Sequence, residues 1–204
     1  MKAFVIRIIL LSVVLISCDK KPEIKTKSCC SKENQAEKAH IIPGESVYNL
    51  ISIWKTQNNK SIRLSYFENK IVIAAMVFTH CESACPRIVA DMQRIESSLS
   101  QKELQQVTFL LISMDPERDT PARLTEFAAE HKLNTNWTLI CSSQDATMEI
   151  ANVLGVKVKK LEGGGFDHSN IIHVFNKDGV IDYQQNGFAE DQSECIQAIR
   201  TLLE

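Results

Sequence analysis

The chain of 204 residues has no strong excess of charge of either sign, no long apolar run and no internal repeat. Its 23 basic and 25 acidic residues are interspersed and give a formal net charge of −2. That balance excludes a basic surface of the kind that binds nucleic acids or other polyanions. The apolar stretch from Ile8 to Ile16 is too short to span a bilayer, which excludes an ordinary transmembrane helix there.

The amino terminus instead has the features of an export signal. Lys2 and Arg7 flank the apolar stretch, whose length is typical of a signal-peptide core. The stretch ends in Leu15-Ile16-Ser17-Cys18, which resembles the lipobox of bacterial lipoproteins, where the cysteine is lipidated and becomes the first residue of the mature chain. We therefore expect a signal peptide over residues 1–17, a lipid anchor at Cys18 and an extracytoplasmic location at a membrane of the bacterial cell envelope. The alternative is an ordinary secretory signal, which also leads to export.

Residues 18–44 are rich in lysine, glutamate, serine and glutamine and show almost no apolar periodicity. Such a segment cannot bury enough surface to fold, so we expect a flexible tether. The remaining residues, 45–204, are about 160 in number, enough for one well-filled domain and too few for two. The sequence thus predicts a single exported domain on a tether.

Two cysteines lie between a wholly apolar segment and an amphipathic one. Ile71 to Phe78 is typical of a strand buried on both faces, and apolar residues recur at helical spacing from Ile88 onward. Proline disfavours helical geometry for the residue before it and suits the first helical position, so we expect the helix to begin at Pro86 with Cys81 and Cys85 in the loop ahead of it. That loop permits either a disulfide or a shared metal, and the helix dipole would lower both thiol pKa values.

The elements that follow alternate between strand and helix. Two further signals are specific: Thr120 suits an N-cap before Pro121, and Asp178-Gly179 suits a tight hairpin. The expected strands are Val47 to Ile53, Ser61 to Leu64, Val107 to Ser113, Thr138 to Cys141, Ile171 to Phe175 and Val180 to Tyr183, and the expected helices run from Pro121 to His131, from Ala146 to Leu154 and from Asp191 onward. This order predicts an α/β, thioredoxin-like fold, with a central mixed sheet flanked by helices on both faces.

A histidine precedes the strand Ile171 to Phe175, in a polar, glycine-rich segment expected to be a loop free to approach the cysteines. Oxidoreductases of this fold usually carry a cis-proline at that place, but none of the five prolines lies near it. His168 is present instead. Two thiolates and one imidazole form a soft, low-coordinate set that suits Cu(I) and can hold Cu(II) with a further ligand, whereas a structural zinc site normally has four ligands.

Three separated motifs in this order, FTHCESACP, SMDPERDTP and DHSNIIHVFNKDGVIDYQQN, resemble those of the Sco/SenC family. Its members are thioredoxin-like copper proteins that help to assemble the dinuclear copper centre of cytochrome c oxidase. The resemblance covers residues 45–204 and implies that Cys81, Cys85 and His168 are copper ligands. It also implies that the partner is a copper-accepting subunit of cytochrome c oxidase or of a related copper enzyme.

Two functional classes stay open at this point. In the first, the protein captures copper and passes it on by ligand exchange. In the second, Cys81 and Cys85 cycle between dithiol and disulfide and reduce the cysteines of an apo respiratory-enzyme subunit or of a redox-signalling partner. A peroxide-reducing enzyme fits less well, because it needs a single nucleophilic cysteine with a nearby threonine and arginine.

The other candidate residues have structural interpretations. We expect His173 to be a sheet histidine, and Asp119 to have a structural role, while Asp115 and Arg118 either orient the site or cap the next helix. The remaining histidines and cysteines divide into solvated (His40, His131), buried (Cys141, Cys195) and tether positions of open function (Cys29, Cys30).

Overall fold

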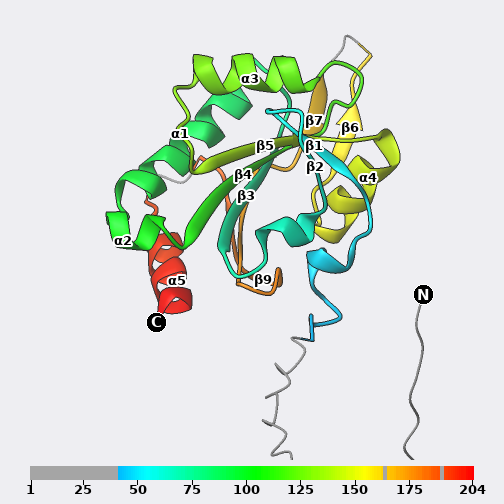
Figure 1. Cartoon of the computed structure of the whole chain (residues 1–204). Helices are drawn as coiled ribbons and strands as arrows, with labels where there is room; N and C mark the ends of the chain where they lie inside the picture. The colour runs from blue at the N-terminus through cyan, green and yellow to red at the C-terminus, as the bar shows by residue number, and fades with distance from the viewer. Residues whose placement is uncertain (1–40, 163–164, 189–190) are drawn as a thin grey trace, which may run out of the picture. The chain divides into compact units, whose positions relative to one another are not determined.

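The computed structural model describes residues 41–162, 165–188 and 191–204 (Figure 1). The expected signal peptide, the lipid anchor at Cys18, the tether cysteines Cys29 and Cys30, and His40 lie outside the described residues. None of the helices in the described part of the chain is long and apolar enough to cross a membrane.

A seven-stranded sheet in the order β2-β1-β5-β4-β3-β8-β9 forms the centre of the domain. Its strands are β1 (Trp54–Thr56), β2 (Ser61–Ile62), β3 (Ile71–Val77), β4 (Val107–Ser113), β5 (Trp137–Cys141), β8 (Ile171–Phe175) and β9 (Ile181–Asn186). β3, β4 and β5 are parallel to one another, and the outer strands join them antiparallel. Every residue of β3 is buried, as the unbroken apolar run predicts for a central strand covered on both faces.

Helices cover both faces of this sheet (Figure 1). They are α1 (Ala84–Ser97), α2 (Gln101–Leu104), α3 (Pro121–Glu130), α4 (Gln144–Val153) and α5 (Ser193–Leu203), with 3-10 turns η1 (Val47–Asn49) and η2 (Leu64–Phe67). The steps from β3 to β4 and from β4 to β5 run in one direction, so right-handed crossovers place α1 and α3 on the same face. From β5 the chain crosses back in the opposite direction towards β8, and this crossover places α4 on the other face of the sheet. The thioredoxin-like fold class is therefore confirmed.

The first predicted strand and the start of the last predicted helix are wrong. The segment expected to be the first strand forms η1 and an extended stretch, and pairing starts only at Trp54. The Ser46 hydroxyl accepts the N–H of Tyr48 and the chain folds onto the β8–β9 turn, so tertiary contacts outweigh the β propensity of the segment. The last helix begins at Ser193, because the Asp191 carboxylate accepts the N–H and the hydroxyl of Ser193 and forms a turn ahead of the helix.

A separate two-stranded hairpin, β6 (Val158–Lys160) and β7 (Phe166–His168), carries the predicted histidine. His168 therefore lies at the end of a short strand, and the expectation of a loop is wrong there. Its partner is Val158, and Phe166 is opposite Lys160. Alternate residues of a strand point to the same face, so His168 and Phe166, two positions apart in β7, project to the same side of the hairpin.

The chain enters the domain at the end of the sheet opposite to the cysteines. The N–H of Val47 donates to the carbonyl of Gly179, in the β8–β9 turn, at 3.0 Å. That turn follows Phe175, which pairs with Val72 near the start of β3. Cys81 follows the other end of β3, and a strand rises about 3.3 Å per residue. The length of β3 thus separates the entry point from the cysteines by about 20 Å.

Candidate metal centre

The two cysteines straddle the start of α1 rather than sharing a loop. The helix begins at Ala84, so Cys85 lies in its first turn and Cys81 in the loop before it, which corrects the expected start at Pro86. The first N–H groups of a helix have no partner within it, so a proline in the first turn removes no helical hydrogen bond. The Cys81 sulfur accepts the N–H of Cys85 at 3.3 Å and thereby occupies one of these free donors.

The two thiols have opposite electrostatic environments. Burial, the largest single influence, acts to raise the pKa of Cys81, but hydrogen bonds from the backbone and thiol of Cys85 and from the N–H groups of Ser83 and Ala84 outweigh it and lower that pKa. Burial raises the pKa of the wholly buried Cys85 well above the usual thiol value, despite a hydrogen bond from the N–H of Phe78. The lowering predicted for both thiols is confirmed for Cys81 and wrong for Cys85.

His168 lines the same surface cavity as Cys81, a hollow of about 490 Å³ at the mouth of the first βα loop. The Phe78 ring at the end of β3 supports the β6–β7 hairpin, because it packs edge-on against Phe166 and His168 with centroid separations of 5.2 and 6.0 Å. Burial lowers the pKa of His168 and keeps the imidazole neutral. Nδ1 lies 3.2 Å from the carbonyl of Ser169 and donates to it, which leaves the lone pair on Nε2.

The three predicted ligands are neighbours but are not yet in ligand geometry. Among the described residues, the group of ligand atoms that all lie within 4.8 Å of one another is His80, Asp115 and Asp119. At least one pair among Cys81, Cys85 and His168 is therefore further apart than 4.8 Å. Metal bonds of about 2.3 Å to sulfur and 2.0 Å to nitrogen bring any two ligands within about 4.6 Å. Metal capture by this set would thus require the ligand atoms to move closer together.

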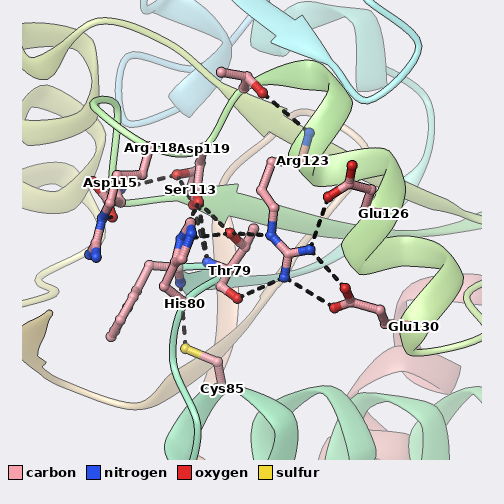
Figure 2. A network of polar contacts seen from close by, with 12 residues as sticks. Thr79, His80, Cys85, Ser113, Asp115, Arg118, Asp119, Arg123, Glu126 and Glu130 are labelled. Carbon is pink, nitrogen blue, oxygen red and sulfur yellow. Dashed lines mark hydrogen bonds and ion pairs between the residues drawn. The ribbon is translucent and has the colours of Figure 1, made fainter.

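A buried carboxylate fixes the cysteine loop to the loop after β4 (Figure 2). Asp119 accepts the N–H of Thr79 through both oxygens, at 3.3 and 3.2 Å, and the hydroxyls of Thr79 and Ser113 at 2.6 Å each. Hydrogen bonds to a charged group contribute about 1.5–3 kcal/mol each, so the net effect on loop geometry is large. The structural role predicted for Asp119 is confirmed. Thr120, not Asp119, caps α3.

Two arginines make further polar contacts with these loops (Figure 2). Arg123 donates to the hydroxyl and the carbonyl of Thr79 at 3.1 Å each and pairs with Glu130 on the next turns of α3. Arg118 pairs with the buried Asp115, and it also lines the cavity beside Cys81. Asp115 and Arg118 therefore orient the loop at the site.

The sequence does not reveal these cross-loop partners. His80 and Arg123 approach the site only because the strand-end loops of β3 and β4 meet at one edge of the sheet. The presence of two βα units with polar strand ends is the signal that could have indicated such a meeting. The pairing of Lys160 on the hairpin with Glu117 after β4, at 2.6 Å, is a further cross-loop contact.

The remaining candidates lie away from the cavity. His173 is fully buried and its Nε2 lies 3.0 Å from the carbonyl of Leu154, which confirms a sheet histidine. Cys141 and Cys195 are buried, as predicted. The solvation expected of His131 is only partial, because its ring packs against Phe127 with a centroid separation of 4.3 Å.

Comparison with known proteins agrees with the fold and with the motifs. The SCO1 protein homolog of Bacillus subtilis (strain 168) is 28% identical over 138 residues, which cover 66% of this chain and 71% of that protein. The crystal structure of a SCO1/SenC family lipoprotein from Bacillus anthracis str. Ames has a TM-score of 0.70 at 22% identity and covers 78% of this chain and 96% of its own. That of Arabidopsis thaliana ScoI with copper bound has a TM-score of 0.63 at 20% identity, covering 74% and 96%.

The family model described as SCO1/SenC matches residues 49–204. This match includes the whole central sheet, the two cysteines at the start of α1 and the histidine of the β6–β7 hairpin. The chain belongs to the SCO1/SenC family.

Proposed function

We propose that this protein binds one copper ion through Cys81, Cys85 and His168 and delivers it to a copper-accepting respiratory protein. The observation that carries the proposal is that Cys81 and a neutral imidazole, His168, line one surface cavity, while the N–H of the buried Cys85 donates to the Cys81 sulfur. Thiolates and imidazole are the ligands that Cu(I) prefers. The Arabidopsis ScoI structure, which has copper bound, supports the same cargo here.

The geometry suits release as well as capture. The cavity is open to solvent, and Cys81 and His168 are reached from its surface while Cys85 lies beneath. An incoming ligand of the recipient can thus replace Cys81 or His168 before the buried Cys85 sulfur releases the copper ion. A three-ligand set that assembles by movement of the β6–β7 hairpin and the cysteine loop holds its ion less tightly than a rigid four-ligand cage. Transfer by ligand exchange needs this weaker hold.

The recipient and the location follow from the sequence motifs. We assign the dinuclear copper centre of cytochrome c oxidase, or that of a related copper enzyme, as the destination. We place the domain on the extracytoplasmic side of a bacterial membrane, anchored through a lipidated Cys18 after removal of residues 1–17, with residues 18–44 as the tether. The B. anthracis relative is named a lipoprotein, which supports this placement.

The unequal thiols favour a second function, reduction of a disulfide in the recipient. The exposed Cys81 thiolate attacks one sulfur of the partner disulfide and forms a mixed disulfide, which releases the first partner thiolate. Cys85 then loses its proton and attacks the Cys81 sulfur, and the second partner thiolate leaves. Two electrons pass to the partner, and a Cys81–Cys85 disulfide remains. Its formation removes both thiolate ligands, so copper binding and reduction exclude each other.

Competition titration against a Cu(I) chelator tests the copper assignment. The reduced full chain, with Cys29→Ser and Cys30→Ser so that the tether thiols do not compete, should bind one Cu(I). His168→Ala should lower the affinity at least a hundredfold, because loss of an outer partner of a ligand alone costs about 10–100-fold. Cys81→Ser and Cys85→Ser should abolish tight binding.

The matched control is His131→Ala, which removes an imidazole outside the cavity and should leave the affinity unchanged. Wild-type affinity in His168→Ala would contradict the ligand assignment. A wild-type chain that binds no Cu(I), yet reduces a disulfide peptide through a cycling Cys81–Cys85 pair, would instead establish the second function alone.

A further inference from the structure

Among the described residues, His80 is the second imidazole that lines the cavity, after the proposed ligand His168. It lies between Thr79 and Cys81 and lines the same cavity as Cys81 and His168. Its side chain is 43% exposed, so the ring is accessible from that cavity, whereas Asp119 behind it is fully buried. Neither the copper ligands nor the loop framework described above requires this imidazole.

The hydrogen bonds around Thr79 fix which nitrogen of His80 carries the proton (Figure 2). The Thr79 hydroxyl has one proton, and it donates that proton to Asp119 at 2.6 Å. The same oxygen accepts from Arg123 Nε at 3.1 Å. It can therefore only accept from His80 Nδ1, which lies 3.2 Å away. His80 Nδ1 is thus the protonated nitrogen.

The second nitrogen of the ring is consequently a lone-pair donor. In the neutral imidazole, a proton on Nδ1 leaves Nε2 free, on the ring edge turned away from Thr79 and Asp119. The Asp119 carboxylate, 3.7 Å from Nδ1, reinforces this tautomer. A carboxylate behind one nitrogen and a free lone pair on the other is the arrangement that holds most metal-binding histidines.

We propose that His80 is the fourth ligand of the site and that it binds the oxidised ion, Cu(II). This inference rests on the proposed function and deepens it. Two thiolates and one imidazole complete a low-coordinate Cu(I) site, but Cu(II) favours four ligands in a tetragonal or flattened arrangement. Of the described side chains that line the cavity, His80 is the remaining one with a nitrogen lone pair. Asp115 and Asp119 of the adjacent cluster are committed to Arg118, Thr79 and Ser113.

The assignment distinguishes the two oxidation states of the cargo. Loss of His80 should leave Cu(I) binding within about threefold of wild type, since the three-ligand set is intact. It should lower the retention of Cu(II) at least tenfold, equivalent to about 1.4 kcal/mol. His80 thereby favours the oxidised ion and lowers the reduction potential of bound copper.

The test is pulsed electron paramagnetic resonance of the Cu(II)-loaded full chain, in the Cys29→Ser and Cys30→Ser background at one copper per chain. The wild type should show two coupled imidazoles. His80→Asn should show one, and it retains an amide donor in the place of Nδ1, so the contact with Thr79 can persist. The control His131→Asn should show two.

A second variant tests the assignment of His80 if His80→Asn does not fold. His168→Ala should still show one coupled imidazole, which is His80. Two imidazoles in Cu(II)-loaded His80→Asn, or a single one in the wild type, would overturn the assignment of His80 while leaving Cu(I) binding intact. Absence of Cu(I) and Cu(II) binding in the wild type would overturn both the assignment and the proposed function.

Discussion

At the scale of the residue, two cysteines of one motif are made chemically unequal by their positions at a helix start. Cys81, in the loop, accepts hydrogen bonds from the N–H groups of the first turn, which stabilise its thiolate. Cys85, inside that turn, is enclosed by the core. One sulfur is therefore available to a partner while the other is protected, and this order is useful for copper exchange and for disulfide exchange alike.

Alkylation of the reduced, metal-free chain should reflect that inequality. Because only the thiolate reacts and the pKa of Cys81 is lowered, its iodoacetamide rate should level off below the pH at which an ordinary thiol does so. As pH falls through that lowered pKa, the rate should decline. Peptide mapping by mass spectrometry assigns each cysteine. Cys85, and Cys195 with its pKa raised by burial to about 12, should remain unmodified at neutral pH.

The order of modification decides this prediction. Cys81→Ser should remove the fast phase within the described domain and leave the buried thiols slow. Modification of Cys85 before Cys81 would contradict the environments derived from the structure.

The sequence predicted the candidate ligands themselves because they lie in short motifs with chemical character. It could not predict what holds them. Thr79 and Arg123 are 44 positions apart, and Thr79 and Asp119 are 40 apart, so their contacts depend on how two loops meet in space. The tautomer of His80 depends on the same contacts, and no local pattern encodes it.

At the scale of the element, the β8–β9 hairpin depends on one glycine. Gly179 has a φ of +76° and a Cβ added there would lie 2.6 Å from the Tyr48 ring. The Tyr48 hydroxyl donates to the carbonyl of Phe67 at 3.2 Å, which limits any movement of the ring. The turn, η1 and η2 are thus packed together at this end of the sheet.

Gly179→Ala should lower the free energy of unfolding by about 3 kcal/mol. The left-handed backbone costs an alanine about 1–2 kcal/mol, and the overlap with Tyr48 adds to it. Gly155→Ala is the matched control, because Gly155 has a φ of +66° but nothing within 4 Å of the added Cβ. It should cost only about 1 kcal/mol. Urea denaturation monitored by circular dichroism measures both, and equal losses would show that the Tyr48 contact does not limit the turn.

Elements with a clear apolar pattern or a helix cap were predictable from the sequence, and elements without such a local signal were not. The apolar runs of β3, β4 and β8 and the capped start of α3 specify their elements locally. The start of α1 and the strand β7 do not follow from local pattern. A thiol supplies the missing hydrogen-bond partner in the first case, and pairing across the glycine-rich segment creates the strand in the second.

At the scale of the whole molecule, the domain has two functional ends. The proposed copper ligands Cys81 and Cys85 follow the carboxyl end of β3, and the described chain enters near the amino end of that strand (Figure 1). The length of residues 45–204 predicted a single domain, and the order of elements predicted its fold class. The position of the entry point relative to the site could not be predicted, because it depends on the contact between η1 and the β8–β9 turn.

The proposed lipid anchor makes a testable statement about the full chain. Cys18→Ser should release the protein from the membrane fraction of the producing bacterium, because stable anchoring depends on burial of more than one acyl chain. Mass spectrometry of the mature amino-terminal peptide should show the lipid on Cys18 in the wild type. Cys29→Ser should stay with the membranes. A wild-type protein processed at another residue and found in the soluble fraction would contradict the anchor.

The separation of the entry point from the cysteines also determines whether two partner proteins can bind the domain at the same time. Under the proposed anchoring, the domain is attached at one end, and its free face at the other end holds the proposed copper ligands. In the proposed delivery, the supplier of copper and its recipient would both dock over the same cavity, so the two complexes would be mutually exclusive. Each delivery cycle therefore includes a step in which the loaded domain has left one partner and has not yet met the next, and retention of the ion during that interval is what the ligand set has to provide.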